Sequence, residues 1–156
     1  MSIKLNRNYQ ETTLLMVEDD DIDATAIERA LRKLRLLNPV RRARDGQEAL
    51  DMLRAGTIPP PFMILLDLNM PRMGGLEFLQ TLRGDTALMD AVVFVLTTSK
   101  SDEDVMAAYR KHVAGYLLKQ RMDPDFLEAI GLIDHYWRVV ELPVPGAGLP
   151  AAVASD

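Results

Sequence analysis

Polar residues that could do chemistry stand directly after four short apolar runs of the chain. Glu18 and Asp19 follow the run TLLMV, and Asp67 follows FMILL. Thr97 follows VVFVL, and Lys119 follows GYLL. Apolar runs of this length, several of them rich in β-branched residues, are typical of buried strands. Each of these polar residues is therefore predicted to lie at the end of a strand.

Together these residue types indicate a site for a metal ion and a phosphoryl group. The carboxylates of Glu18, Asp19 and Asp67 would repel one another if they were crowded, and a hard cation such as Mg²⁺ relieves that repulsion. A lysine and a threonine hydroxyl supply a positive charge and a hydrogen-bond donor for an anionic group, as phosphoryl transfer requires. Asp67 would then be the nucleophile, because a carboxylate can attack phosphorus to give an acyl phosphate.

Five strands alternate with five helical segments along the sequence. The strands are predicted at residues 13–17, 40–43, 62–66, 92–96 and 115–118. Apolar residues at helical spacing predict helices at about residues 22–34, 49–53, 76–82, 102–112 and 124–140. Parallel strands need crossover connections, so this alternation predicts a doubly wound, five-stranded parallel α/β sheet. The ligand site of such a sheet lies beyond the carboxyl ends of its strands, where these polar residues converge.

Composition narrows the class of protein. The length of 156 residues suits one domain, and a net charge of −5 without a dense basic run predicts no direct contact with nucleic acid or with a membrane. No cysteine is present, which excludes disulfides and thiolate metal sites. The apolar runs are far too short to span a bilayer, so we expect a cytoplasmic protein.

The ends of the chain differ in composition from its middle. Residues 1–11 are expected to form a loose N-terminal arm, and residues 12–142 the folded domain. Residues 143–156 lie in a stretch rich in proline, glycine and alanine without periodicity, which predicts a flexible tail.

Five segments resemble, in order, the receiver domains of bacterial two-component response regulators. They are LLMVEDD, DGQEAL, LLDLNMPRMGG, VVFVLTTS and GYLLKQ, and the resemblance covers about residues 12–140. The spacings from Asp67 to Thr97 and from Thr97 to Lys119 are also similar to those of receivers. The resemblance implies a flavodoxin-like (βα)5 fold and a single-domain regulator that accepts a phosphoryl group from a sensor histidine kinase. Such a protein catalyses only its own phosphorylation and dephosphorylation and is otherwise not an enzyme.

The resemblance also implies which residues bind the metal ion. Glu18 and Asp19 match the acidic pair that holds Mg²⁺ in receivers, and Asp67 matches the phosphoacceptor, which is also a metal ligand. Asn69 stands where the family donates a backbone carbonyl to the metal.

A second group of residues matches the parts that respond to phosphorylation. Thr97 corresponds to the hydroxyl that moves onto the phosphoryl group, and Lys119 to the lysine that contacts it. Tyr116 corresponds to the aromatic residue that changes rotamer. The chain departs from the family at Gln120, where receivers usually have a proline, and this leaves the geometry of that loop open.

The last predicted helix carries two further indications. The segment FLEAIGLIDHYWRVVELP resembles a subset of single-domain regulators that serve phytochrome-type sensor kinases. Apolar residues cover roughly half of the helix circumference, which is wider than the stripe of a helix that faces only its own core. We expect a symmetric homodimer through this helix, with packing at the sheet edge or under the N-terminal arm as the alternatives.

Other interpretations of these residues remain open at this stage. Asp20 and Asp21 are predicted to stabilise the start of a helix rather than to bind metal. A phosphatase of the haloacid-dehalogenase type also uses an aspartyl nucleophile, but it needs an acid at the position of Asn69. A degenerate receiver that acts only as an interaction module is a second rival, which the complete set of site residues disfavours. Phosphate uptake on Asp67 distinguishes all three.

Overall fold

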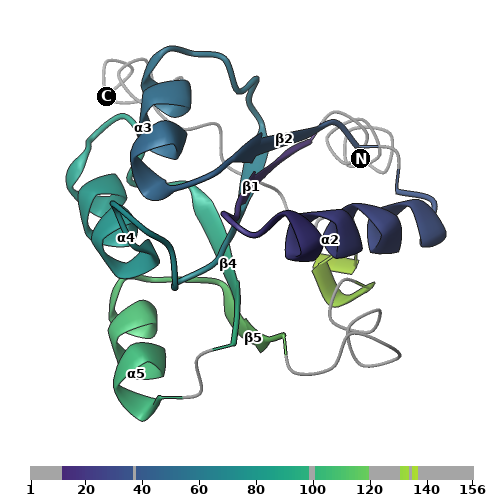
Figure 1. Ribbon diagram of the computed structural model, residues 1–156. Coiled ribbons are helices and arrows are strands. Elements are labelled where there is room, and N and C mark those ends of the chain that lie inside the picture. Colours follow the sequence, from purple (N-terminus) through teal and green to yellow (C-terminus); the bar gives the residue numbers. More distant parts are fainter. Residues whose placement is uncertain (1–11, 37, 99–100, 120–130, 134, 137–156) are drawn as a thin grey trace.

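Five parallel strands form one sheet in the order β2-β1-β3-β4-β5 (Figure 1). This computed structural model describes residues 12–36, 38–98, 101–119, 131–133 and 135–136. The strands are β1 (Thr13–Val17), β2 (Val40–Ala43), β3 (Phe62–Leu66), β4 (Val92–Thr97) and β5 (Gly115–Leu118). They occupy the predicted positions, except that β4 extends one residue further, to Thr97. The doubly wound, flavodoxin-like α/β fold is confirmed.

Helices connect successive strands and begin at recognisable caps. They are α2 (Asp21–Lys33), α3 (Gly46–Arg54), α4 (Gly75–Gly84) and α5 (Asp102–Arg110). The Asp20 carboxylate accepts the backbone N–H groups of Ile22 and Asp23, so its predicted capping role is confirmed. Among the residues that the structure describes, no helix is both long and apolar enough to cross a bilayer.

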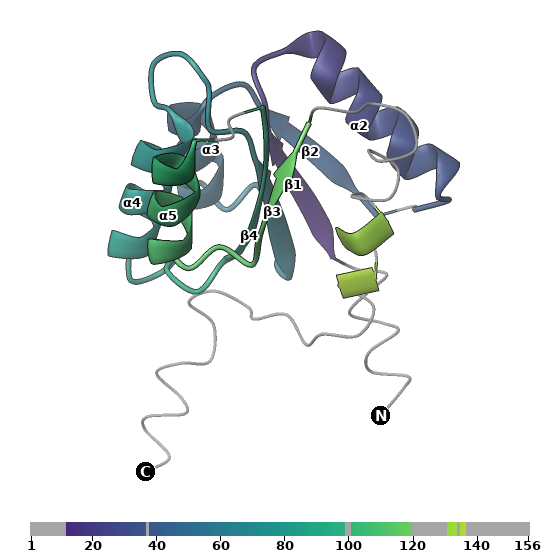
Figure 2. The same cartoon turned by 90° about the horizontal axis from the view of Figure 1, so that it is seen from below.

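The helices cover both faces of the sheet (Figure 2). On one face α3, α4 and α5 pack against Leu15, Val17 and their neighbours. On the other face α2 packs against Leu14 and Met16. Alternate residues of one strand therefore belong to two separate cores, which explains why the central strands are apolar throughout. These two layers hold the carboxyl ends of the strands in place.

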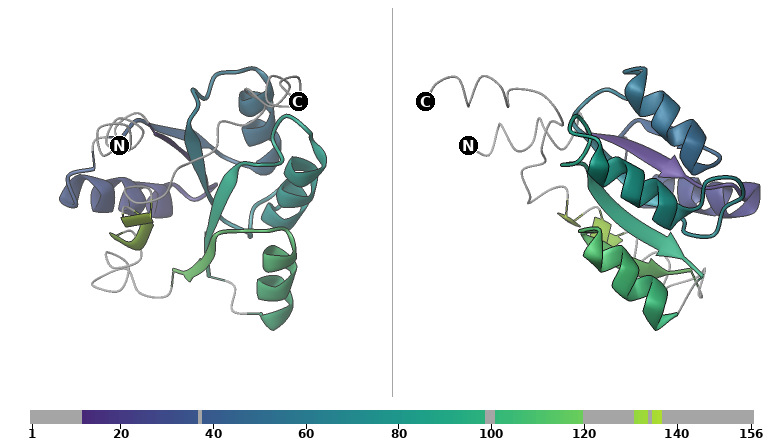
Figure 3. Two further views of the ribbon diagram at one scale, coloured as in Figure 1. Left: turned by 180° about the vertical axis from the view of Figure 1, so that it is seen from behind. Right: turned by 90° about the vertical axis from the view of Figure 1, so that its left-hand side faces the viewer.

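Part of the last predicted helix lies on the α2 face (Figure 3). Residues 131–133 and 135–136 are helical, and Ile133 is buried against the core beneath α2. The ring of Tyr136 meets that of Phe94 edge to face, with ring centroids 4.9 Å apart. Leu132 points outward and is 53% exposed. The expected arm at 1–11, the expected tail at 143–156 and the rest of this helix fall outside the described residues.

Candidate functional site

The site lies where the chain reverses direction within the sheet order. From β1 the chain passes outward to β2 and then returns to β3 on the other side of β1. The helix that follows β1 covers one face, whereas the helix that follows β3 covers the opposite face (Figure 2). Such a switch point leaves a crevice beyond the strand ends, and Glu18, Asp19 and Asp67 are the residues that follow β1 and β3.

Three carboxylates meet at this point. Glu18, Asp19 and Asp67 each offer one oxygen, and these oxygens all lie within 4.8 Å of one another. Glu18 and Asp67 are buried, whereas Asp19 is more exposed and leaves the cluster open on one side. Carboxylate oxygens with room for retained water are the donors that Mg²⁺ prefers. The residues therefore fit a small divalent cation, as the sequence predicts.

The backbone around Asp67 is held from both sides. The N–H of Asp67 donates to the Val17 carbonyl at 3.0 Å, which extends the pairing of β1 with β3 past the last strand residue. On the other side α4 begins directly against this loop. A Cβ at Gly75 would lie 2.6 Å from the Asp67 carbonyl oxygen and 2.6 Å from Leu68 Cα, so only glycine fits there. This packing fixes the backbone that carries the Asp67 side chain.

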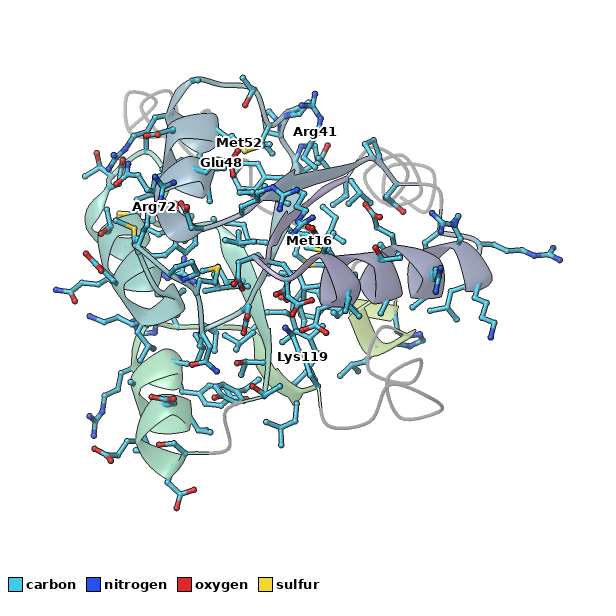
Figure 4. The ribbon with its side chains drawn as sticks, in the orientation of Figure 1. Met16, Arg41, Glu48, Met52, Arg72 and Lys119 are labelled. Atoms are coloured by element: carbon cyan, nitrogen blue, oxygen red, sulfur yellow. The ribbon has the colours of Figure 1, made fainter. Side chains whose placement is uncertain are left out.

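Lys119 projects from the end of β5 into the carboxylates (Figure 4). Its Nζ lies 2.5 Å from Glu18 Oε1 and 3.5 Å from Asp67 Oδ2. A third carboxylate, that of Asp23 on α2, lies 2.8 Å from the same Nζ. The Lys119 side chain is only 4% exposed, so the ammonium is buried among three anions. Such a charge can meet an anionic group on Asp67 without first losing a shell of water.

Burial and neighbouring charges shift the pKa values of Glu18 and Lys119. Burial, reinforced by the charge of Asp67, raises the pKa of Glu18 from its ordinary 4.5 to about 7, although the hydrogen bond from Lys119 opposes the change. Burial would by itself lower the pKa of Lys119, but hydrogen bonds to Asp23 and Glu18 outweigh it and raise that pKa above its usual value. Lys119 is therefore charged at neutral pH, and Glu18 takes up a proton more readily than an ordinary glutamate.

The remaining predicted residues lie around Asp67 and Thr97. Thr97 is fully buried at the end of β4, and the Asn69 side-chain amide donates to its hydroxyl at 3.4 Å. The Asn69 backbone N–H donates to Asp67 Oδ1 at 3.3 Å. Tyr116 on β5 is half-buried and packs against the core on the side of α3, α4 and α5. Gln120 lies outside the described residues.

Residues 14–131 match the family described as the response regulator receiver domain. The chain belongs to this family. The match covers most of the folded domain and includes every residue of the acidic cluster together with Thr97 and Lys119. All of these polar groups therefore lie within the part of the chain that matches the receiver domain.

Two curated proteins, one of which also has a solved structure, illustrate the relationship. The probable methanogenesis regulatory protein FilR2 of Methanothrix harundinacea is 39% identical over 127 residues, which are 80% of this chain and 82% of that protein. Response regulator Rcp1 of Synechocystis is 34% identical over 135 residues, which are 83% of this chain and 92% of Rcp1. The solved Mn²⁺-bound form of Rcp1 superimposes with a TM-score of 0.76 over 85% of this chain and 99% of that chain.

A third relative is a phytochrome response regulator of known structure. The structure of the phosphorylated cyanobacterial phytochrome response regulator RcpA is 31% identical and covers 85% of this chain and 99% of its own. Its TM-score is 0.77. The receiver described here is thus similar to phytochrome-associated response regulators, which agrees with the resemblance of the C-terminal segment.

The sequence did not reveal Asp23 as part of the receiver site. An acid in the first turn of a helix also stabilises the helix dipole, so its residue type alone does not distinguish the two roles. Asp23 meets Lys119 across 96 residues of sequence, because the start of α2 and the end of β5 come together at the same edge of the sheet. Asp21, two residues earlier, pairs instead with Arg42 and Arg44 and stays 71% exposed.

Proposed function

We propose that this receiver is a phosphoacceptor that takes a phosphoryl group onto Asp67 from the phosphorylated histidine of a sensor kinase. One observation supports the proposal above the others. The buried Lys119 ammonium and the acidic cluster meet at the Asp67 carboxylate, so that positive charge and a cation-binding group are both present at one nucleophile.

The proposed reaction is an exchange of bonds at phosphorus. A carboxylate oxygen of Asp67 forms the new P–O bond while the P–N bond of the phosphohistidine breaks. The imidazole leaves with the electron pair of that bond and takes up a proton. Lys119 and Thr97 supply the donor groups for the phosphoryl oxygens. A Mg²⁺ ion held by Glu18, Asp19 and Asp67, with the Asn69 carbonyl as a further ligand, would neutralise charge on those oxygens.

A change in the surface of the protein follows from the same residues. Thr97 ends β4 and Tyr116 lies in β5, which pairs directly with it. A shift of the Thr97 hydroxyl from Asn69 onto the phosphoryl group would therefore act on β5, where Tyr116 pairs with Val95, two residues before Thr97. Tyr116 packs against the core on the side of α3, α4 and α5, and Val95, which lies on the same face of β4 as Thr97, belongs to that core. We propose that this movement alters the surface presented to other proteins.

The proposed partners follow from the relatives and from the last helix. The similarity to RcpA supports a phytochrome-type histidine kinase as the phosphodonor, and phosphotransfer from such a kinase would take place in the cytoplasm. The exposed Leu132 supports a homodimer through the last helix, although Tyr136 is partly used in packing against Phe94. The homodimer remains a proposal.

Phosphoryl uptake from acetyl phosphate tests the function directly. We expect intact-mass spectrometry to show one added phosphoryl group on the wild type with Mg²⁺ and none when a chelator removes the ion. Asp67→Asn should abolish the added mass, whereas Asp51→Asn, an exposed aspartate of α3, should leave it unchanged. Uptake by Asp67→Asn at the wild-type level would refute the assignment. No uptake by any form would instead favour a module that works without phosphorylation.

A further inference from the structure

Lys119 has one more anionic neighbour than its proposed role requires. Glu18 and Asp67 belong to the acidic cluster, but Asp23 does not. Asp23 nevertheless lies 2.8 Å from Lys119 Nζ, nearer than Asp67 at 3.5 Å. The Asp23 side chain is 28% exposed, so its carboxylate stands at the rim of the site beside the buried ammonium.

We propose that Asp23 is a positioning residue that holds the Lys119 ammonium away from Asp67 until a phosphoryl group arrives. The inference rests on the proposed function, because it concerns the same lysine and the same phosphoacceptor. In this proposal the Asp23 carboxylate competes with Asp67 for the Lys119 ammonium. The strength of the Asp23–Lys119 interaction then determines how readily the ammonium reaches Asp67.

The distances show how the N–H groups of the Lys119 ammonium are divided among Glu18, Asp23 and Asp67. An ammonium has three N–H groups; one reaches Asp23 at an ordinary hydrogen-bond distance of 2.8 Å, and another reaches Glu18 at 2.5 Å, which is shorter than usual. The 3.5 Å separation from Asp67 is longer than an ordinary hydrogen bond, although it is close enough for an ion pair. Asp67 therefore has the weakest hold on the lysine in the unphosphorylated protein.

Glu18 and Asp23, the two carboxylates closest to Lys119, differ in how they compete with Asp67 for the ammonium. Glu18 belongs to the acidic cluster, so a bound cation would engage its charge. Asp23 lies outside that cluster, so its carboxylate would still interact with Lys119 when a cation is bound. For the ammonium to move onto a phosphoryl group at Asp67, the hydrogen bond to Asp23 has to break or lengthen.

The start of α2 aims Asp23 at this position. The Asp20 carboxylate accepts the backbone N–H of Asp23 at 3.0 Å, which fixes the first helical turn. Asp21 and Asp23 then diverge, because Asp21 pairs with Arg42 and Arg44 near β2, whereas Asp23 pairs with Lys119 at the end of β5. Two acids of one turn thus differ in partner, and they give a matched pair of variants.

The contact itself is testable without phosphorylation. In the metal-free protein, ¹⁵N-detected NMR of the lysine ammonium groups should show a slowly exchanging Lys119 signal, assigned by its loss in Lys119→Arg. Asp23→Asn should shift that signal and speed its proton exchange, whereas Asp21→Asn should leave it in place. An unmoved Lys119 signal in Asp23→Asn would overturn the inference.

Phosphorylation kinetics test the consequence. With Mg²⁺ and a fixed, subsaturating concentration of acetyl phosphate, Asp23→Asn should take up phosphoryl faster than wild type, by about fivefold, the ratio expected for loss of a partly exposed ion pair. Asp21→Asn removes the same charge two residues away and should show a smaller change. Asp23→Glu, which restores the anion, should return the rate toward that of wild type. A gain in rate cannot arise from damage to the fold.

The outcomes separate this inference from the proposed function. Slower uptake by Asp23→Asn, or a gain that Asp21→Asn matches, would overturn the inference while wild-type labelling at Asp67 left the proposed function intact. If neither wild type nor any variant took up phosphoryl, the proposed function itself would fail, and the NMR result would still decide whether Asp23 holds Lys119.

Discussion

Magnesium affinity should depend on pH because one of the proposed ligands is a buried carboxyl group. Burial raises the pKa of Glu18 to about 7 in the metal-free protein. With that pKa, Glu18 is about nine-tenths protonated at pH 6 and about one-tenth protonated at pH 8. Mg²⁺ has to displace this proton, so the apparent affinity at pH 6 should be about tenfold weaker than at pH 8.

The same shift fixes the sign of the stability change. Because the pKa of Glu18 is raised on folding from 4.5 to about 7, the metal-free folded protein binds more protons than the unfolded chain between these values. The contribution of Glu18 to stability is therefore full below pH 4.5 and is lost as the pH rises to 7. Stabilisation of the fold by saturating Mg²⁺ should accordingly increase over this interval.

Isothermal titration calorimetry measures both the affinity and the released proton. Titrations in two buffers of different ionisation enthalpy should show about 0.9 proton released per Mg²⁺ at pH 6 and about 0.1 at pH 8. Asp19→Asn should bind more weakly but keep the pH dependence, whereas Glu18→Gln should lose it. Equal affinity at both pH values, with no proton released, would show that Glu18 is not the titrating ligand and refute the reasoning.

Three further outcomes are expected. Gly75→Ala should lower the free energy of unfolding by roughly 1–3 kcal/mol and slow phosphorylation, since the new Cβ would press on the backbone that carries the phosphoacceptor; retained stability and rate would contradict the close approach. Arg83→Met should cost roughly 3 kcal/mol in urea unfolding, because the guanidinium donates to four backbone carbonyls, whereas the exposed Arg54→Met should cost little. Asp19→Asn should weaken Mg²⁺ binding and phosphorylation together, whereas Asp21→Asn should leave Mg²⁺ affinity unchanged; equal affinities would remove Asp19 from the ligand set.

Local patterns were sufficient to predict the sheet and the ends of its strands. Apolar runs such as FMILL are buried on both faces, and the first polar residue after each run marks the edge where ligands bind. The helix boundaries were less accurate. The predicted helix at 102–112 ends at Arg110, and His112 instead adopts a positive φ of 61°. A helix end depends on the fit of the next turn, which apolar spacing does not specify.

Contacts between distant segments could not be predicted from residue types. Arg83 resembles any basic residue near a helix end, yet it ties the end of α4 to the loops before β4 and β5. Arg72 donates to Asp45, which also caps α3, and so links the loop after β3 to the loop after β2. Both contacts, like that of Asp23 with Lys119, depend on how whole elements pack. The acidic cluster could be predicted from the sequence only because parallel strands end at a common edge of the sheet.

The most direct test of the central claim locates the phosphoryl group on the chain. After reaction with acetyl phosphate and Mg²⁺, borohydride reduces an aspartyl phosphate to homoserine, and peptide mass spectrometry identifies the altered residue. We predict conversion at Asp67 alone, dependent on Mg²⁺ and absent from Asp67→Asn. Conversion at another aspartate, or an unaltered Asp67 in protein that has gained phosphoryl mass, would contradict the account.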